Sequence, residues 1–183
     1  IQANGSKNLF RSHFVRSNSP IKINGLIWMG NKDFMLEQIK TKIDLGFSCL
    51  KLKIGAIDFE EELNILKSIR AEYSHDVLEL RVDANGAFEP ENALDKLNTL
   101  SEFDLHSIEQ PIKQGQLKEM AKLCELSPLP IALDEELIGV ITLADKQWLL
   151  EKIQPHYIIL KPSLTGGIKG SNEWIEAAGE LSI

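Results

Sequence analysis

Short apolar runs and amphipathic segments alternate along the chain from residue 21 onward. The apolar runs are typical of strands, and each is followed by apolar residues at helical spacing, such as Leu36, Ile39 and Ile43. The predicted strands are 21–29, 48–54, 77–82, 104–108, 129–133 and 157–160. A helix is expected after each of them, and no two strands are consecutive. This alternation predicts a parallel sheet with crossover helices.

Residues at the expected helix ends support this division. We expect Asp33 and Asp58 to cap the first two of these helices, and Pro90 to lie in the first turn of the third. Residues 1–20 are polar and contain the stretch Ser-Asn-Ser-Pro, so we expect an irregular linker before the first strand.

Two architectures contain repeated βα units in this order, a doubly wound sheet and a TIM-type (β/α)8 barrel. The Gly-x-Gly-x-x-Gly fingerprint does not follow the first predicted strand, and no Walker A sequence occurs. This weakens the doubly wound, nucleotide-binding alternative. We therefore predict an α/β chain with about six βα units of a barrel over residues 21–183.

Charge and cysteine content narrow the function classes. The 20 basic and 27 acidic residues give a net charge of −7, which argues against nucleic-acid and anionic-membrane surfaces. No apolar run approaches the roughly 18 residues of a membrane helix. Cys49 and Cys124 occur in no CxxC or Cys/His pattern, so we expect neither a disulfide scaffold nor a zinc site, and a cytoplasmic location.

Charged residues recur near the ends of the predicted strands. They follow one another at intervals of 30, 26, 25 and 27 residues, in the order Lys53, Asp83, Glu109, Asp134 and Lys161. A barrel of ~250 residues has about 30 residues in each βα unit, so each interval corresponds to one unit. Any of these residues alone could be an ordinary turn or solvent-facing residue. Together they predict a charged carboxyl-terminal edge of the sheet, where barrel enzymes place their active sites.

Alternation in the second predicted strand adds another lysine to this face. Lys51 and Lys53 lie two residues apart, so their side chains share a face, while the other face carries Leu50, Leu52 and Ile54. In a barrel the apolar face would pack against helices and the lysines would point inward. Inward lysines need polar partners, and the strand-end carboxylates are the candidates.

Three carboxylates at adjacent strand ends need a cation between them. An all-oxygen set suits a hard ion such as Mg²⁺, which keeps water and substrate oxygens among its ligands. We expect a lysine beside such a dication to have a lowered pKa and to serve as a base near neutral pH. The residues therefore predict proton abstraction beside a substrate carboxylate, with Mg²⁺ stabilising the enolate.

The motifs around these residues resemble the enolase superfamily in its muconate-lactonising subgroup. The spacing of KxK, DxN, EQP, DE and KP carries this resemblance. The resembling segments are NGLIWMG (24–30), LKLKIG (50–55), RVDANGAF (81–88), SIEQPI (107–112), ALDEELIG (132–139) and LKPSLTGG (160–167).

The resemblance implies a role for each residue of the predicted site. Asp83, Glu109 and Asp134 would bind Mg²⁺. Lys53 would take the α-proton and then protonate the departing hydroxide, while Lys161 would lie over the other face of the substrate ring. The supporting residues would be Lys51, Asn85 and Glu135.

Within the subgroup the chain is most similar to the members that dehydrate 2-succinyl-6-hydroxy-2,4-cyclohexadiene-1-carboxylate to 2-succinylbenzoate in menaquinone biosynthesis. The resemblance thus implies a lyase that acts on a small-molecule carboxylate. Racemisation of N-acylamino acids, epimerisation of dipeptides and muconate cycloisomerisation remain alternatives, because they share the proton-abstraction step. An inert fragment is a further alternative, and the sequence leaves the oligomeric state open.

Members of this family carry a capping domain before a barrel of eight strands. The resemblance therefore implies that residues 1–20 are a linker or the tail of such a capping domain. Residues 21–183 would be a partial barrel of six βα units, without the seventh and eighth strands.

Overall fold

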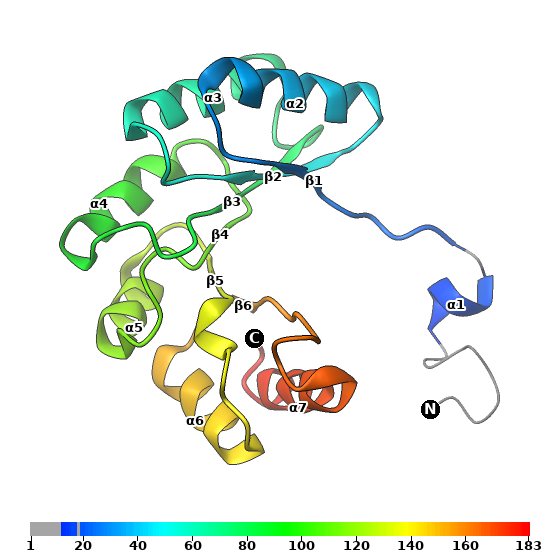
Figure 1. Cartoon of the computed structure of the whole chain (residues 1–183), viewed down its shortest axis with the longest axis vertical. Coiled ribbons are helices and arrows are strands. Elements are labelled where there is room, and N and C mark those ends of the chain that lie inside the picture. The colour runs from blue at the N-terminus through cyan, green and yellow to red at the C-terminus, as the bar shows by residue number, and fades with distance from the viewer. Residues whose placement is uncertain (1–11, 18) are drawn as a thin grey trace.

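The computed structural model describes residues 12–17 and 19–183, and six parallel strands form a single sheet within them (Figure 1). Their order in the sheet is their order in the chain, from β1 to β6. The strands are β1 (Gly25–Ile27), β2 (Cys49–Lys53), β3 (Glu79–Asp83), β4 (Ser107–Glu109), β5 (Ile131–Leu133) and β6 (Tyr157–Ile158). This arrangement confirms the predicted parallel βα architecture.

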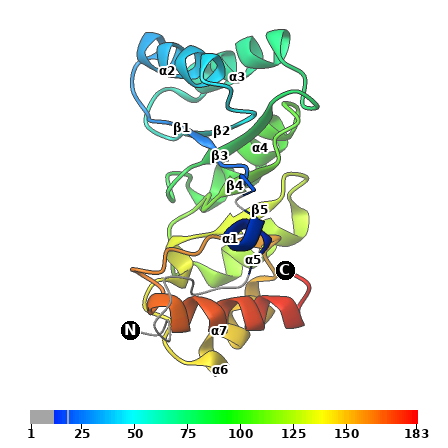
Figure 2. The same ribbon diagram turned by 90° about the vertical axis from the view of Figure 1, so that its right-hand side faces the viewer.

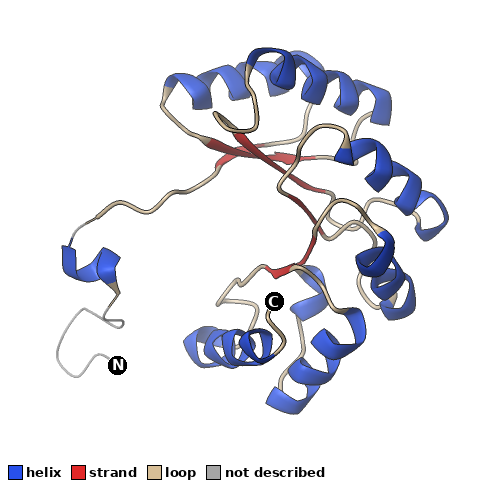
Figure 3. Ribbon diagram, turned by 180° about the vertical axis from the view of Figure 1, so that it is seen from behind, coloured by secondary structure: helices blue, strands red, loops and turns tan. Residues whose placement is uncertain are grey.

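A helix follows each strand, and these helices cover the outer side of the curved sheet, while one further short helix precedes β1 and lies apart from the sheet (Figure 3). The helices are α1 (His13–Ser17), α2 (Lys32–Asp44), α3 (Phe59–Glu72), α4 (Pro90–Ser101), α5 (Leu117–Leu126), the short 3-10 helix η1 (Glu135–Leu137), α6 (Leu143–Ile153) and α7 (Gly167–Glu180). None of these helices has the length and apolar character that would let it span a membrane.

The hydrophobic core lies between the sheet and the helices. Leu50 and Leu80 from the strands pack there with Leu66 and Leu97 from the helices, and all four side chains are fully buried. The apolar face of β2 thus meets the helices, as its alternation predicted. The opposite face of β2, which carries the two lysines, points to the inside of the curve.

The strand register aligns the charged positions at one edge of the sheet. Lys53 pairs with Asp83, and Asp83 pairs with Glu109 on the next strand. Figure 2 shows the strands following one another across the sheet in chain order. Since all strands are parallel, their carboxyl ends lie together, which is the condition for a common site.

Several predicted boundaries are wrong in detail. The strand expected at 21–29 is confined to Gly25–Ile27, because it pairs only with β2 and ends where that pairing ends. The sixth strand ends at Ile158 rather than residue 160, so Lys161 lies in the loop that follows. Part of the expected irregular linker forms α1, whereas residues 1–11 and 18 of that linker lie outside the described residues.

The predicted helix starts are confirmed in two cases out of three. Asp58 caps α3 through a hydrogen bond from the backbone N–H of Glu60, and Pro90 is the first residue of α4. Asp33 does not cap α2. Asn31 does so instead, because its side chain accepts the backbone N–H of Phe34 while Asp33 already lies within the first turn.

Candidate active site

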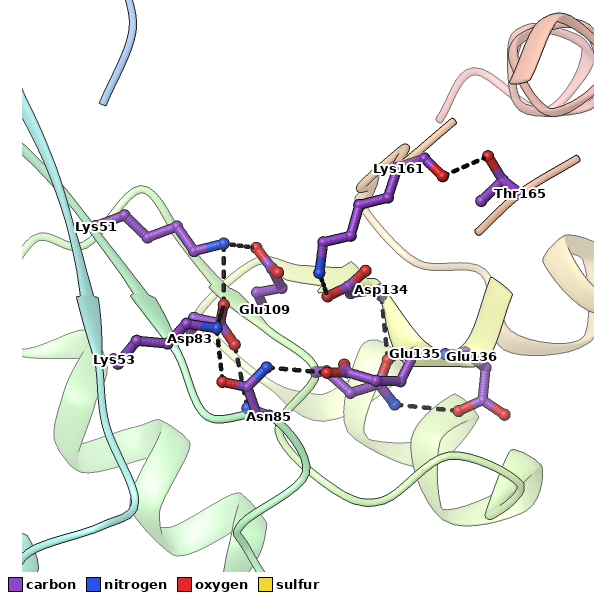
Figure 4. A network of polar contacts seen from close by, with 11 residues as sticks. Lys51, Lys53, Asp83, Asn85, Glu109, Asp134, Glu135, Glu136, Lys161 and Thr165 are labelled. Atoms are coloured by element: carbon purple, nitrogen blue, oxygen red, sulfur yellow. Dashed lines mark hydrogen bonds and ion pairs between the residues drawn. The ribbon is translucent and has the colours of Figure 1, made fainter. Parts of the chain in front are cut away.

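Lys51 and Lys53 project from β2 towards the carboxylates of the next two strands (Figure 4). Lys53 Nζ donates to Asp83 Oδ2 at 2.5 Å and to Asn85 Oδ1 at 2.6 Å. Lys51 Nζ lies 2.9 Å from the same Asp83 oxygen and also donates to Glu109 Oε2. Both side chains are largely buried, with exposures of 16% and 13%. The sheet thus brings two ammonium groups onto one carboxylate.

Three buried carboxylates mark the ends of three consecutive strands. Asp83 and Glu109 are the last residues of β3 and β4, and Asp134 follows β5 directly. Asp83 is fully buried, and Glu109 and Asp134 are almost so. Glu109 Oε1 is a buried oxygen without a hydrogen-bond partner. A buried oxygen of this kind is costly unless a cation or a hydrogen-bond donor lies next to it.

Asn85 and Glu135 connect the lysines to the segment after β5. Asn85 Nδ2 donates to Glu135 Oε1 at 2.9 Å, while its backbone N–H donates to Asp83 Oδ1 at 3.1 Å. Asn85 has a left-handed backbone with φ of 45°, which turns its side chain back over the strand end. Glu135 Oε2 is a second buried oxygen without a partner.

Lys161 approaches the site from the opposite side, from the loop after β6. Its ammonium group donates to Asp134 Oδ2, and Thr165 Oγ1 donates to its backbone carbonyl at 3.1 Å. Lys161 is more exposed than the β2 lysines, at 42% of its side chain. Figure 4 shows all eight residues that the sequence predicted for the site at this one edge of the sheet. Their individual roles remain predictions.

Lys51 and Lys161 contact carboxylates directly, and both have raised pKa values. Burial tends to lower the pKa of Lys51, but its hydrogen bonds and attraction to Glu109 and Asp83 outweigh burial and raise it. Lys161 behaves in the same way, because contact with Asp134 outweighs its burial. The lowered pKa expected from the sequence concerns a lysine beside a dication and stays a prediction. Here the carboxylates face the ammonium groups directly, so the charged lysine is favoured.

The pKa values of Asp83 and Glu109 are shifted in opposite directions. Burial tends to raise the pKa of Asp83, but hydrogen bonds from Lys53 and Lys51 outweigh burial and lower it. The pKa of Glu109 rises from 4.5 to about 7. Burial is the largest cause, and the negative charge of Asp83 adds to it, while the hydrogen bond from Lys51 acts in the opposite direction. Asp83 contacts two ammonium groups, whereas Glu109 contacts only that of Lys51, so the charged form is favoured at Asp83 and disfavoured at Glu109.

The donor chemistry fits Mg²⁺, although the described part of the chain holds no ready-made three-ligand cluster. Among residues 12–17 and 19–183, no group of three His, Cys, Asp or Glu side chains is arranged to hold a metal ion. Lys51, Lys53 and Lys161 instead pair with carboxylate oxygens that a cation would contact. The three carboxylates are hard oxygen donors, and Glu109 keeps one buried oxygen free of partners.

Sequence reasoning missed a buried amide beside the predicted metal ligands. Gln110 is fully buried and bonds to the backbone of Asp134 and to the carboxylate of Glu136, which is also buried. Gln110 lies in the EQP motif and Glu136 directly follows the DE motif, so the signal was present in the sequence. What the motifs could not show is that the chain turns Gln110 inward after Glu109.

A second missed residue fixes the loop after β2. Glu62 is buried in α3, and its Oε1 accepts the backbone N–H of Gly55 at 2.6 Å. Gly55 has φ of 91°, and a Cβ there would lie 2.4 Å from the Cβ of Ala87. The chain directly after Lys53 is therefore held closely against the loop that follows β3.

A curved parallel βα sheet whose carboxyl-terminal edge gathers lysines and carboxylates defines a barrel-type enzyme domain. Residues 35–183 match the family described as enolase C-terminal domain-like. The chain belongs to this family, which confirms the resemblance seen in its motifs. Enzymes of the enolase superfamily use a lysine or histidine base together with Mg²⁺.

Relatives with assigned activities place the chain within the family. It is 55% identical to the o-succinylbenzoate synthase of Desulfotalea psychrophila over 183 residues, which is all of this chain and 50% of that protein. It is 28% identical to the L-amino acid-D/L-Glu epimerase of Sulfurimonas denitrificans, over 97% of this chain and 50% of that protein. The chain thus spans about half the length of the curated relatives it matches.

Solved structures agree with the sequence relatives. The crystal structure of MenC from Desulfotalea psychrophila superposes with a TM-score of 0.86 at 55% identity, over 95% of this chain and 48% of that one. The muconate cycloisomerase of Pseudomonas fluorescens superposes with a TM-score of 0.77 at 25% identity, over 88% and 44% of the two chains.

Proposed function

We propose that the protein is an o-succinylbenzoate synthase, a Mg²⁺-dependent lyase. It would convert 2-succinyl-6-hydroxy-2,4-cyclohexadiene-1-carboxylate to 2-succinylbenzoate and water, the reaction expected in menaquinone biosynthesis. The observation that carries this proposal is the 55% identity over the whole chain to a relative of that name, against 28% for the epimerase relative. The arrangement of lysines and carboxylates supports the same chemistry.

The proposed ligands of Mg²⁺ are Asp83, Glu109 and Asp134. They are buried oxygen donors from neighbouring strand ends, and a partnerless oxygen of Glu109 supports the assignment. When bound, the cation supplies positive charge that stabilises the enolate form of the substrate carboxylate and holds that carboxylate in place.

Lys53 is the proposed acid and base. As a neutral amine, it would take the proton from the carbon that bears the substrate carboxylate, which leaves the electron pair of that C–H bond in the enolate. The electron pair then forms the new ring double bond as the C–O bond on the neighbouring carbon breaks. Lys53 would return its proton to the departing hydroxide, so the products are the aromatic ring and water.

The other lysines would set the charge around the substrate. Lys161 lies across the carboxylates from Lys53 and would face the opposite side of the substrate ring, where its positive charge favours the enolate (Figure 4). Lys51 bridges Asp83 and Glu109 and would keep both carboxylates in place. Asn85 joins Lys53 to Glu135 and would orient the lysine.

The proposal is tested by assaying the complete product of the coding sequence that contains this chain. Dehydration of the cyclohexadiene substrate is followed by the appearance of the aromatic product, with Mg²⁺ present and after its removal by EDTA. Racemisation of N-succinylamino acids is measured in parallel. We expect Mg²⁺-dependent dehydration, and racemase activity without dehydration would overturn the proposal.

Epimerisation or racemisation is the second candidate function. The observation that favours it is the placement of Lys53 and Lys161 on opposite sides of the carboxylates, because one lysine could take a proton from one face and the other return it to the opposite face. A single-lysine variant separates the two candidates. In Lys161→Ala, Lys53 should still exchange the substrate α-proton with solvent on one face, whichever function is correct. Only a racemase would in addition lose the interconversion of its two substrate stereoisomers.

A reducing compartment would suit the protein under this proposal. Cys49 and Cys124 are both buried and free, and burial raises the pKa of each thiol, to about 11 and about 12. We therefore place the proposed reaction in the cytoplasm.

A further inference from the structure

Gln110 lies between the chain after β4 and the chain after β5, next to two of the proposed ligands, and its side chain contacts none of the proposed catalytic side chains. Its carboxamide uses all four of its hydrogen-bonding positions. Oε1 accepts the backbone N–H groups of Asp134 at 3.1 Å and Glu136 at 3.3 Å. Nε2 donates to the carbonyl of Ile112 at 3.0 Å and to Glu136 Oε2 at 3.1 Å. A fully buried amide with every position used is a strong local constraint.

The backbone of Gln110 joins the same strands. Its N–H donates to the carbonyl of Ala132 in β5 at 2.9 Å, and its carbonyl accepts the N–H of Gly86, after β3, at 2.7 Å. Gln110 also has φ of 40°, a left-handed conformation that a residue other than glycine keeps only where its surroundings hold it. The turn brings the side chain from the end of β4 to the start of η1.

Glu136 extends the connection to a further loop. Its Oε2 accepts from Gln110, and its Oε1 accepts the backbone N–H of Gly115 at 2.8 Å. The Gln110–Glu136 pair therefore ties the chain after β4 to the chain after β5. These are the two chain segments that carry Glu109 and Asp134.

We propose that Gln110 is a positioning residue that sets the placement of the Asp134 carboxylate relative to Glu109. This inference rests on the proposed function, because it takes both carboxylates as Mg²⁺ ligands. The hydrogen bond to the backbone N–H of Asp134 fixes the point from which that side chain extends, and the direct neighbour of Gln110 in the chain is Glu109. Loss of the carboxamide would let the two ligands move apart and would weaken Mg²⁺ binding.

The test measures Mg²⁺ affinity by titration calorimetry on the complete coding product. Gln110→Met removes the carboxamide at similar volume. Gln110→Glu keeps the acceptor for the two N–H groups but places its carboxylate against that of Glu136. Combining Gln110→Glu with Glu136→Gln restores the hydrogen bond between the two side chains, with the donor now at position 136. The control is Arg70→Met, since Arg70 donates to the carbonyls of Leu78, Phe103 and Asp104 at the opposite edge of the sheet.

We expect Gln110→Met to bind Mg²⁺ at least about tenfold more weakly than the wild type, as is typical when a residue that orients metal ligands is lost. The double variant should bind Mg²⁺ at least about threefold more tightly than Gln110→Glu. Arg70→Met should lose stability to urea but keep its Mg²⁺ affinity. An unchanged affinity in Gln110→Met, a double variant no tighter than Gln110→Glu, or an equal loss in Arg70→Met would overturn the inference. If Gln110→Met does not fold, the comparison of Gln110→Glu with the double variant decides.

Activity measured on the same preparations separates this inference from the proposed function. A wild-type protein that dehydrates the cyclohexadiene substrate, with a Mg²⁺ affinity that Gln110→Met leaves unchanged, overturns only the positioning role. A wild-type protein without dehydratase activity, whose Mg²⁺ affinity still falls in Gln110→Met, overturns only the proposed function.

Discussion

Replacing Glu109 by glutamine should stabilise the metal-free protein at alkaline pH while removing a proposed Mg²⁺ ligand. Burial raises the pKa of Glu109 to about 7, since a single ammonium group, that of Lys51, is shared with Asp83 and does not offset burial. In the unfolded chain the same carboxyl titrates near 4.5. The folded protein therefore holds a proton on Glu109 more tightly than the unfolded chain does.

The sign and size of the effect follow from this difference. Between pH 4.5 and about 7 the unfolded chain releases the Glu109 proton first, so the wild type loses stability as the pH rises. The displacement of the pKa corresponds to about 3 kcal/mol of unfolding free energy, lost by about pH 8. Glutamine mimics the protonated carboxyl and does not titrate, so Glu109→Gln avoids this loss.

The assay is urea unfolding of both proteins in EDTA at several pH values between 4.5 and 8, followed by circular dichroism. The difference between the two unfolding free energies should shift in favour of Glu109→Gln by about 3 kcal/mol across this range. Glu176→Gln, at an exposed position on α7, controls for the substitution itself. A difference that stays constant, or that shifts towards the wild type as the pH rises, would refute the reasoning.

Two further substitutions test the chemistry and the packing around the site. Lys53→Ala should abolish dehydration while Mg²⁺ still binds, as measured by calorimetry on the same preparation, and retained turnover would show that another residue is the base. Gly55→Ala should lower the free energy of unfolding by about 1–3 kcal/mol more than Gly46→Ala, because only the former places its Cβ against Ala87. Both glycines have positive φ, so equal losses in urea unfolding would contradict the close contact.

The composition of the site was predictable because it depends on two simple periods. The spacing of about one βα unit brings Asp83, Glu109 and Asp134 to the same edge, and the two-residue period of a strand places Lys51 beside Lys53. Both periods are fixed by backbone geometry. The structure places all five side chains at one edge of the sheet, as these periods require.

The parts that sequence reasoning missed depend on local turns and on pairing. Gln110 has a left-handed backbone conformation after β4, and no spacing rule reveals that such a turn buries its own carboxamide. Asn31 rather than Asp33 caps α2, because the helix begins two residues earlier than the pattern suggested. The direction of the Lys51 pKa shift does not follow from the sequence, because it depends on whether the lysine faces a dication or a bare carboxylate.

The account depends on one divalent ion held by carboxylates from neighbouring strands, and Mg²⁺ titration of the complete coding product measures this directly. We expect one Mg²⁺ per chain in the wild type and no binding in Asp83→Asn. Asp58→Asn is the matched control, since asparagine can also cap α3, and it should bind as the wild type does. A wild type that binds no Mg²⁺, or an Asp83→Asn variant with unchanged affinity, would contradict the account.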